Sequence, residues 1–123
     1  MANEASIVTM ATFAKGNVSS IARGSTTAFT ITVSGAKYHQ GVQNIGTSEE
    51  QISFGDITNP GMCWLKNLDS TNYVEIRSGT GAADLMKLAA GQVAVFMFAA
   101  DCTAPYAIAN TSSVNLEILL VEA

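Results

Sequence analysis

The sequence is short of charge, and basic residues are the scarcest charged class. Six Lys and Arg stand against ten Asp and Glu in 123 residues, and only 13% of the chain is charged. Affinity for nucleic acid comes mainly from clustered Lys and Arg side chains that contact phosphates. Because the six basic residues lie far apart in this sequence, we expect no unaided nucleic-acid binding.

Features that would direct the chain to a membrane or to export are also missing. No apolar run approaches the roughly 18 residues that a transmembrane helix requires. The first residues, Met1 to Ala5, do not combine a basic segment with a following apolar one, as a secretory signal would. We therefore expect a protein without a membrane partner that is made in a cytoplasm.

Histidine and cysteine are too few for common metal or catalytic sites. The single histidine, His39, has no Cys, Asp or Glu at metal-ligand spacing, and no serine lies in a G-x-S-x-G context. Cys63 and Cys102 each lie in an apolar segment and are far apart, which favours buried free thiols over a disulfide. We predict no catalytic residue, no metal and no cofactor.

Two short segments resemble functional motifs but are better explained as loops. Gly79 to Asp84 begins like a dinucleotide-binding glycine pattern, yet Asp84 stands where the third glycine belongs. Glu49 and Glu50 are adjacent, and adjacent side chains on an extended chain point in different directions, so they do not form a matched acid–base pair. We predict that both are solvated turn charges, and an enzyme is the function class that we least expect.

Apolar residues alternate with polar ones throughout the chain, in short runs separated by turn residues. This pattern is typical of β-strands. The runs cover residues 5–14, 26–34, 37–45, 51–54, 62–77, 93–98, 106–109 and 114–121. With about eight or nine strands and no long helix, the sequence predicts an all-β protein: a single antiparallel β-sandwich domain over residues 1–123, with a jelly roll as one form of it.

Three of these segments allow a more detailed prediction. The run 26–34 is expected to turn one face inward, and residues 82–88 fit either one helical turn or an edge strand. The run 93–98, VAVFMF, is apolar on both faces. It fits either a central strand covered on both sides or a strand whose outer face meets another subunit.

The segment on either side of Asp69–Asn72 predicts a β-hairpin with a defined register. With those residues as a four-residue loop, Lys66 faces Glu75 as an ion pair. Trp64 then faces Arg77 as a cation–π pair. The side chains on the opposite, core-facing side are those of Cys63, Leu65, Val74 and Ile76.

Four segments in the C-terminal two thirds carry a recognisable pattern. They are GTSEE at 46–50, KNLDSTNYVEI at 66–76, LAAGQVAVF at 88–96 and ANTSSVNLE at 109–117. This pattern resembles small β-rich proteins encoded among the virion structural genes of tailed bacteriophages. The resemblance fades before about Gly35, and it implies a virion component.

The resemblance and the low charge lead to a hypothesis of a noncatalytic virion structural protein, foremost a capsid decoration (cement) protein. Such a protein would form a homo-oligomer, for which we expect a trimer, and would bind the major capsid protein or other virion proteins. One alternative is a carbohydrate-binding or host-recognition module of a head or tail spike, with Trp64 and a tyrosine as stacking platforms. Another is a minor tail or connector component. The candidate interface residues are Trp64, Arg77, Val93, Val95, Met97 and Tyr106.

Overall fold

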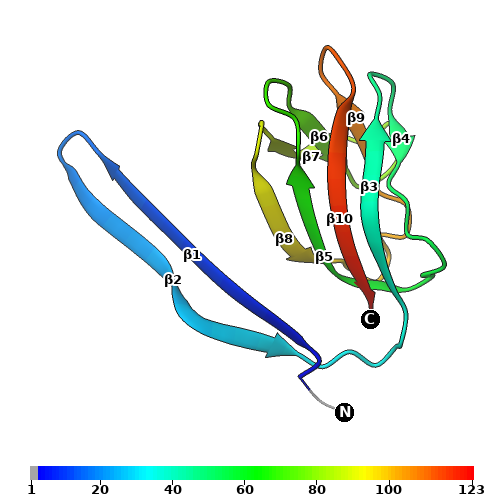
Figure 1. Ribbon diagram of the computed structural model, residues 1–123, viewed down its shortest axis with the longest axis horizontal. Helices are drawn as coiled ribbons and strands as arrows, with labels where there is room; N and C mark the ends of the chain where they lie inside the picture. The colour runs from blue at the N-terminus through cyan, green and yellow to red at the C-terminus, as the bar shows by residue number, and fades with distance from the viewer. Residues whose placement is uncertain (1–2) are drawn as a thin grey trace. The chain divides into compact units, whose positions relative to one another are not determined.

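The computed structural model describes residues 3–123, and every regular element in this range is a β-strand (Figure 1). The chain divides into two units, one up to Val33 and one over Ser34–Ala123. The first unit contains β1 (Ala5–Lys15) and β2 (Val18–Ile31). The second contains β3 (Tyr38–Ile45), β4 (Glu50–Gln51), β5 (Pro60–Asn67), β6 (Val74–Arg77), β7 (Asp84–Leu88), β8 (Val93–Met97), β9 (Tyr106–Ala109) and β10 (Val114–Glu122). The predicted all-β fold class is confirmed.

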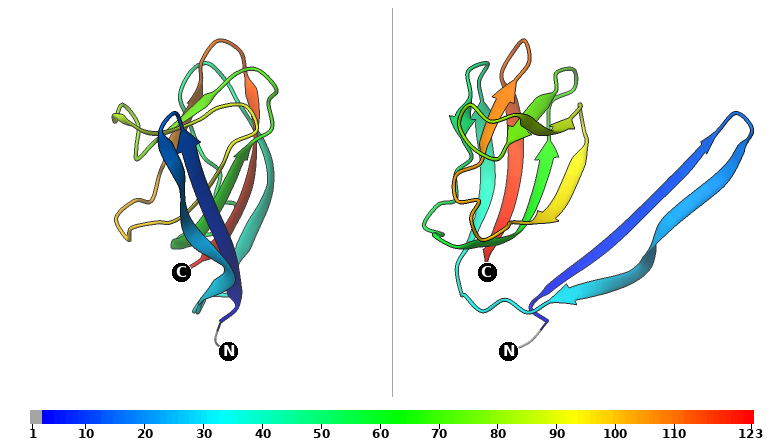
Figure 2. Two further views of the ribbon diagram at one scale, coloured as in Figure 1. Left: turned by 90° about the vertical axis from the view of Figure 1, so that its left-hand side faces the viewer. Right: turned by 180° about the vertical axis from the view of Figure 1, so that it is seen from behind.

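The second unit is a sandwich of two four-stranded antiparallel sheets. Its strands pair first with last: β3 with β10, β4 with β9, β5 with β8 and β6 with β7. Further pairing of β10 with β5 and of β9 with β6 gives the sheets β3-β10-β5-β8 and β4-β9-β6-β7. The second sheet is nearer the viewer in the right-hand view of Figure 2. This nested pairing over eight strands is the jelly-roll arrangement.

Strict alternation of side chains builds the core between the two sheets. Alternate residues of β10, such as Leu116 and Leu120, are fully buried, as the sequence predicts for a strand with one inward face. The four side chains predicted to face the core around Asp69–Asn72 are likewise at most 2% exposed, namely Cys63, Leu65, Val74 and Ile76. Phe98 packs edge-to-face against Phe96 at one end of this core, with ring centroids 4.9 Å apart.

The predicted hairpin across Asp69–Asn72 is wrong. Strand β5 pairs with β10 and β8, whereas β6 pairs with β7 and β9, so the two strands lie in different sheets. Lys66 therefore lies opposite Glu117, and Trp64 lies between Leu119 and Val95 in place of a partner on β6. The core-facing residues were correct because both sheets turn their inner faces toward the same core.

The buried side chain of Asn67 stabilises the connection between β5 and β6. Its amide donates hydrogen bonds to the carbonyl oxygens of Asn72 (2.9 Å) and Leu88 (3.0 Å), and its carbonyl oxygen accepts one from the Asp69 N–H (2.9 Å). The Asp69 carboxylate accepts further bonds from the N–H groups of Thr71 and Asn72, which lower the pKa of Asp69. These contacts carry the chain from one sheet to the other.

The two segments with open alternatives are both edge strands. Residues 84–88 form β7 at one edge of the β4-β9-β6-β7 sheet, so the edge-strand reading of this segment is correct. Strand β8 lies at an edge of the other sheet and pairs only with β5 in the described structure. It is therefore not the central strand that its apolar sequence could have formed, and the subunit-contact alternative stays a prediction.

The sequence predicts one sandwich domain over residues 1–123, whereas the described strands before Ser34 pair only with each other and form a unit of their own. In this first unit β1 and β2 form a long antiparallel hairpin around a two-residue turn at Gly16–Asn17. Gly24 adopts a φ of 99°, and a Cβ atom there would lie 2.2 Å from the Thr9 carbonyl oxygen, which requires glycine. The predicted inward face at 26–34 is not found within this unit, because Phe29 is 45% exposed and β2 has only β1 as a partner among the described strands.

Candidate functional site

The outer face of the β3-β10-β5-β8 sheet carries the single tryptophan of the chain. Cross-strand pairing sets its side chains in two rows over all four strands. One row is Gln40, Leu119, Trp64 and Val95, and the next is Val42, Glu117, Lys66 and Val93. We call these eight residues the tryptophan face.

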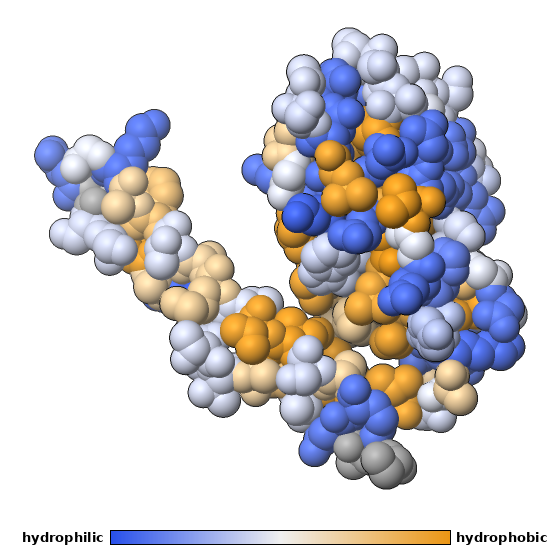
Figure 3. Space-filling view, in the orientation of Figure 1, coloured by the Kyte–Doolittle hydropathy of each residue, from blue (hydrophilic) through white to orange (hydrophobic). Residues whose placement is uncertain are grey.

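The tryptophan face is open and combines apolar side chains with the polar side chains of Gln40, Lys66 and Glu117. A groove of about 550 Å³ crosses it beside the half-buried Trp64, with Gln40 and Glu117 as its polar lining. Val42 is 57% exposed and Val93 46% exposed, and Met97 at the end of β8 is 52% exposed. The space-filling view shows apolar surface interspersed with hydrophilic surface on the visible side of the sandwich (Figure 3).

The structure places four of the six candidate interface residues on one sheet and the other two on the opposite sheet, although Arg77 and Met97 both line a cavity between β7 and β8. Val93, Val95 and Met97 alternate along β8, with Val95 directly opposite Trp64 on β5. Arg77 and Tyr106 are cross-strand partners of each other, but on the outer face of the opposite sheet. The candidate set therefore does not form one continuous site.

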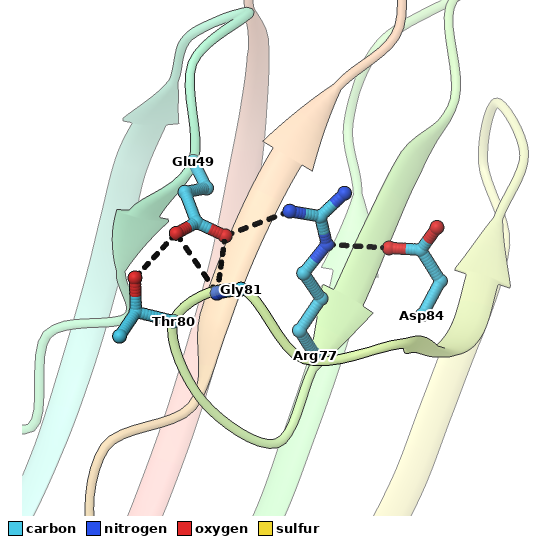
Figure 4. Close-up of polar contacts among 5 residues, drawn as sticks. All are labelled: Glu49, Arg77, Thr80, Gly81 and Asp84. Carbon is cyan, nitrogen blue, oxygen red and sulfur yellow. Dashed lines mark hydrogen bonds and ion pairs between the residues drawn. The ribbon is translucent and has the colours of Figure 1, made fainter.

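Arg77 is held in an ion-pair cluster (Figure 4). Its Nη1 lies 2.7 Å from Glu49 Oε2, and its Nε lies 2.6 Å from Asp84 Oδ1. The Glu49 carboxylate also accepts hydrogen bonds from the Thr80 hydroxyl and from the Gly81 N–H at 3.0 Å. The carboxylate of Glu49, just before β4, thus meets the end of β6 and the loop that follows it.

The cluster shifts the protonation of both central groups. Hydrogen bonds from Thr80 and Gly81, together with Arg77, lower the pKa of Glu49. The carboxylates of Asp84 and Glu49 raise the pKa of Arg77. Every charged group in the cluster has a partner, so its geometry supports a role in holding the loop between β6 and β7. Residues 79–83 form a loop as predicted, and Asp84 is the first residue of β7.

The prediction that Glu49 is a solvated turn charge is therefore wrong. Glu50 behaves differently, since its carboxylate accepts a bond from the Gly46 N–H at 3.0 Å within its own turn. Sequence reasoning missed the role of Glu49 because its partners lie about 30 residues further along the chain. Nothing local in the sequence marks that contact.

The remaining titratable candidates supply no chemical site. Cys63 is buried, and burial raises the pKa of its thiol to about 12, as fits the predicted buried free thiol. Cys102 is also a free thiol but is only half-buried in the β8–β9 connection, so its predicted burial is wrong. Within residues 3–123, no group of three or more His, Cys, Asp or Glu is placed to hold a metal ion.

An apolar cavity of about 350 Å³ opens between the edge strands β7 and β8. The apolar residues around it include Ile76, Met86, Phe96, Phe98 and Pro105. Leu85, which is 69% exposed, and Met97 also line it, together with Asp101 and Cys102. Sequence reasoning missed this cavity because its walls come from edge strands of two different sheets.

Comparison with known proteins found no matching family model, no matching curated protein and no matching solved structure. Among the described residues there is no helix of the length and apolar character needed to cross a bilayer.

Proposed function

We propose that this protein is a noncatalytic structural component of a bacteriophage virion, a capsid decoration (cement) protein that binds the major capsid protein. The observation that carries the proposal is the tryptophan face. Exposed apolar patches larger than scattered single residues mark contact sites for other proteins. Here the exposed Val42 and Val93 project from a hydrogen-bonded sheet that carries Trp64 between Leu119 and Val95.

The make-up of the tryptophan face fits a protein partner. Interfaces combine an apolar, aromatic centre with a polar rim, and a tryptophan near the centre often carries much of the binding energy. Trp64 has Leu119 and Val95 on either side, while Gln40, Lys66 and Glu117 supply hydrogen-bonding groups nearby. A rigid β-sheet presents these groups without the entropy cost of ordering loops.

Two further arguments raise the prior for a virion role. Jelly rolls recur in viral capsid domains, although a fold by itself does not fix a function. The four segments from 46–50 to 109–117 resemble virion structural proteins of tailed phages, and each of them includes strand residues of the sandwich. We accordingly propose the virion as the location of the protein and copies of itself as further partners.

The test compares Trp64→Ala with Trp64→Phe in the phage that encodes the protein. A decoration protein should be present in hundreds of copies per purified virion, counted by quantitative mass spectrometry. Trp64→Ala should weaken binding to capsids by about 2 kcal/mol or more, about 30-fold, if Trp64 is a central anchor, and Trp64→Phe should retain most of it. Unchanged capsid binding by a folded Trp64→Ala protein would overturn the proposal.

A second candidate function, glycan binding, is favoured by the groove beside Trp64. An exposed aromatic face can stack on a sugar ring, and Gln40 and Glu117 could bind its hydroxyl groups. Lectin domains also use jelly rolls. Specific binding on a glycan array that Trp64→Ala abolishes, with virion incorporation unchanged, would establish this function in place of the first.

The third candidate, a minor tail or connector component, differs from both in copy number and position. Electron microscopy of virions labelled on this protein would show a few copies at the tail or neck. A labelled shell surface would instead support decoration.

A further inference from the structure

The hairpin of β1 and β2 exposes large apolar side chains along its length. Five of them are between 45% and 58% exposed, namely Val8, Met10, Phe13, Ile21 and Phe29. A two-stranded hairpin is marginally stable at best in water, because it cannot bury an apolar face by itself. We therefore expect another surface to cover the apolar side chains of the hairpin.

The tip of the hairpin combines an apolar pair with two positive charges. Phe13 lies directly opposite Ile21, so the two side chains share one face. Lys15 precedes the turn, and Arg23 lies two residues beyond Ile21 on the same strand. The first 33 residues carry these two basic groups and one carboxylate, Glu4.

The cavity between β7 and β8 is complementary to this tip. Its walls are mainly apolar, and the exposed Leu85 and Met97 extend the apolar surface at its lining. Asp101 supplies a carboxylate in the same lining, and the positive charge of Arg77, which also lines the cavity, is paired with Glu49 and Asp84. Residues 34–123 as a whole carry nine carboxylates and four basic side chains, so the sandwich attracts a basic tip.

We propose that the hairpin tip of one copy of this chain inserts Phe13 and Ile21 into the β7–β8 cavity of a second copy. Lys15 and Arg23 then lie near the Asp101 carboxylate. The occupant is a second copy because each chain supplies one apolar tip and one apolar cavity, which gives equal numbers of both. This inference rests on the homo-oligomer that is part of the proposed function, and it specifies which surfaces of the copies contact each other.

A contact between a tip and a cavity joins two different surfaces of the same chain. Such head-to-tail contacts close into a ring when the rotation between copies permits it, and otherwise continue as a filament. A closed ring of three copies would be the trimer expected from the sequence. Repetition of one contact also allows a single side chain to control the whole assembly.

The first test measures self-association of the full chain by analytical ultracentrifugation. Leu85→Lys places a charge at the cavity, and Leu68→Lys makes the same change at another exposed leucine, 43% exposed and outside the cavity. The dissociation constant should rise about 30-fold or more for Leu85→Lys, the loss of one interface anchor, and stay unchanged for Leu68→Lys. Equal behaviour of the two variants would overturn the contact.

The same comparison applies to the hairpin. Phe13→Ser at the tip should weaken self-association, whereas Phe29→Ser near the other end of the hairpin should not. A circular dichroism spectrum of each variant checks that the fold is retained. Loss of self-association in both variants or in neither would contradict insertion of the tip.

The second test uses the native Cys102 in the cavity lining. One copy carries Ile21→Cys together with Cys102→Ser, and it is mixed with a second copy that keeps Cys102 and the native Ile21. A short bismaleimide should link the two copies covalently, since each thiol adds to one maleimide. The buried Cys63, present in both copies, is the internal control.

The outcomes separate this contact from the proposed function. A crosslinked dimer in the mixture, absent when either cysteine is missing, supports insertion between copies. A further sample is a single chain that carries both Ile21→Cys and the native Cys102. If this chain crosslinks only within itself, or if the oligomer persists and the mixture gives no crosslink, the contact between copies is overturned. Capsid binding is then still decided by the Trp64 variants. A native monomer that still binds capsids would also overturn the contact between copies, and it would leave the proposed capsid binding intact.

Discussion

Replacing Asn67 by alanine should destabilise the sandwich more than its size suggests. Asn67 is fully buried, and its side chain makes hydrogen bonds to Asn72, Leu88 and Asp69. Alanine removes all three bonds, and the Leu88 carbonyl oxygen is left in a buried position. No other group is placed by these contacts to replace the lost amide.

The magnitude follows from the three bonds. Each contributes about 0.5–1.5 kcal/mol net, and a buried group left unsatisfied costs about 1–3 kcal/mol. The free energy of unfolding should therefore fall by about 2–4 kcal/mol. Asn115→Ala is the matched control, because Asn115 is exposed and its side chain accepts one bond, from Asn44; its effect should be within about 0.5 kcal/mol.

Urea unfolding followed by the fluorescence of Trp64 measures both variants. With a slope of about 2 kcal/mol per molar urea, the midpoint of Asn67→Ala should fall by about 1–2 M, and that of Asn115→Ala should hardly move. Asn67→Asp should also destabilise, since it sets a carboxylate oxygen against the carbonyls of Asn72 and Leu88. A loss below about 1 kcal/mol for Asn67→Ala would refute the assigned role of this side chain.

Two other predictions concern titratable groups. Because the pKa of Glu49 is lowered in the fold, its contacts stabilise the β6–β7 loop above the ordinary glutamate pKa and are lost as the pH falls through the lowered value. In the native protein, protection of the Gly81 amide from hydrogen exchange should drop at acid pH. In Glu49→Gln, the same amide should be less protected, and its protection should hardly depend on pH between about 3 and 6, the range in which glutamates titrate. For Cys63, burial and a pKa near 12 predict that a Cys102→Ser protein reacts with a thiol reagent at neutral pH only after urea unfolds it, so rapid labelling in native buffer would contradict the buried thiol.

The strands and their inward faces were predictable because side-chain alternation is a local property. In β10 the burial of every second residue from Val114 to Leu120 follows the alternation of apolar residues in the sequence. Strand pairing was not predictable in the same way. Lys66 and Glu75 fit a local hairpin equally well, but the partners of β5 come from β8 and β10, much later in the chain.

The other errors have related physical causes. The turn of the N-terminal hairpin did have a local signal, the dipeptide Gly16–Asn17 between two extended runs, which is typical of a two-residue β-turn. The alternation of side chains in β2 was interpreted as burial of one face. Alternation shows only that the two faces of the strand differ in polarity, and it does not show that one of them is buried. The Glu49 cluster and the β7–β8 cavity depend on segments that meet only in the finished sandwich, so no motif marks them.

The nested pairing of the eight sandwich strands also determines in which order the strand pairs form at the lowest entropy cost. The innermost pair, β6 with β7, joins neighbouring segments, whereas β3 and β10 lie at opposite ends of the unit. The entropy cost of joining two segments grows with the length of free chain between them. Each inner pair that forms removes free chain from between the next two strands, so the central position of β10 between β3 and β5 costs least when it is filled last.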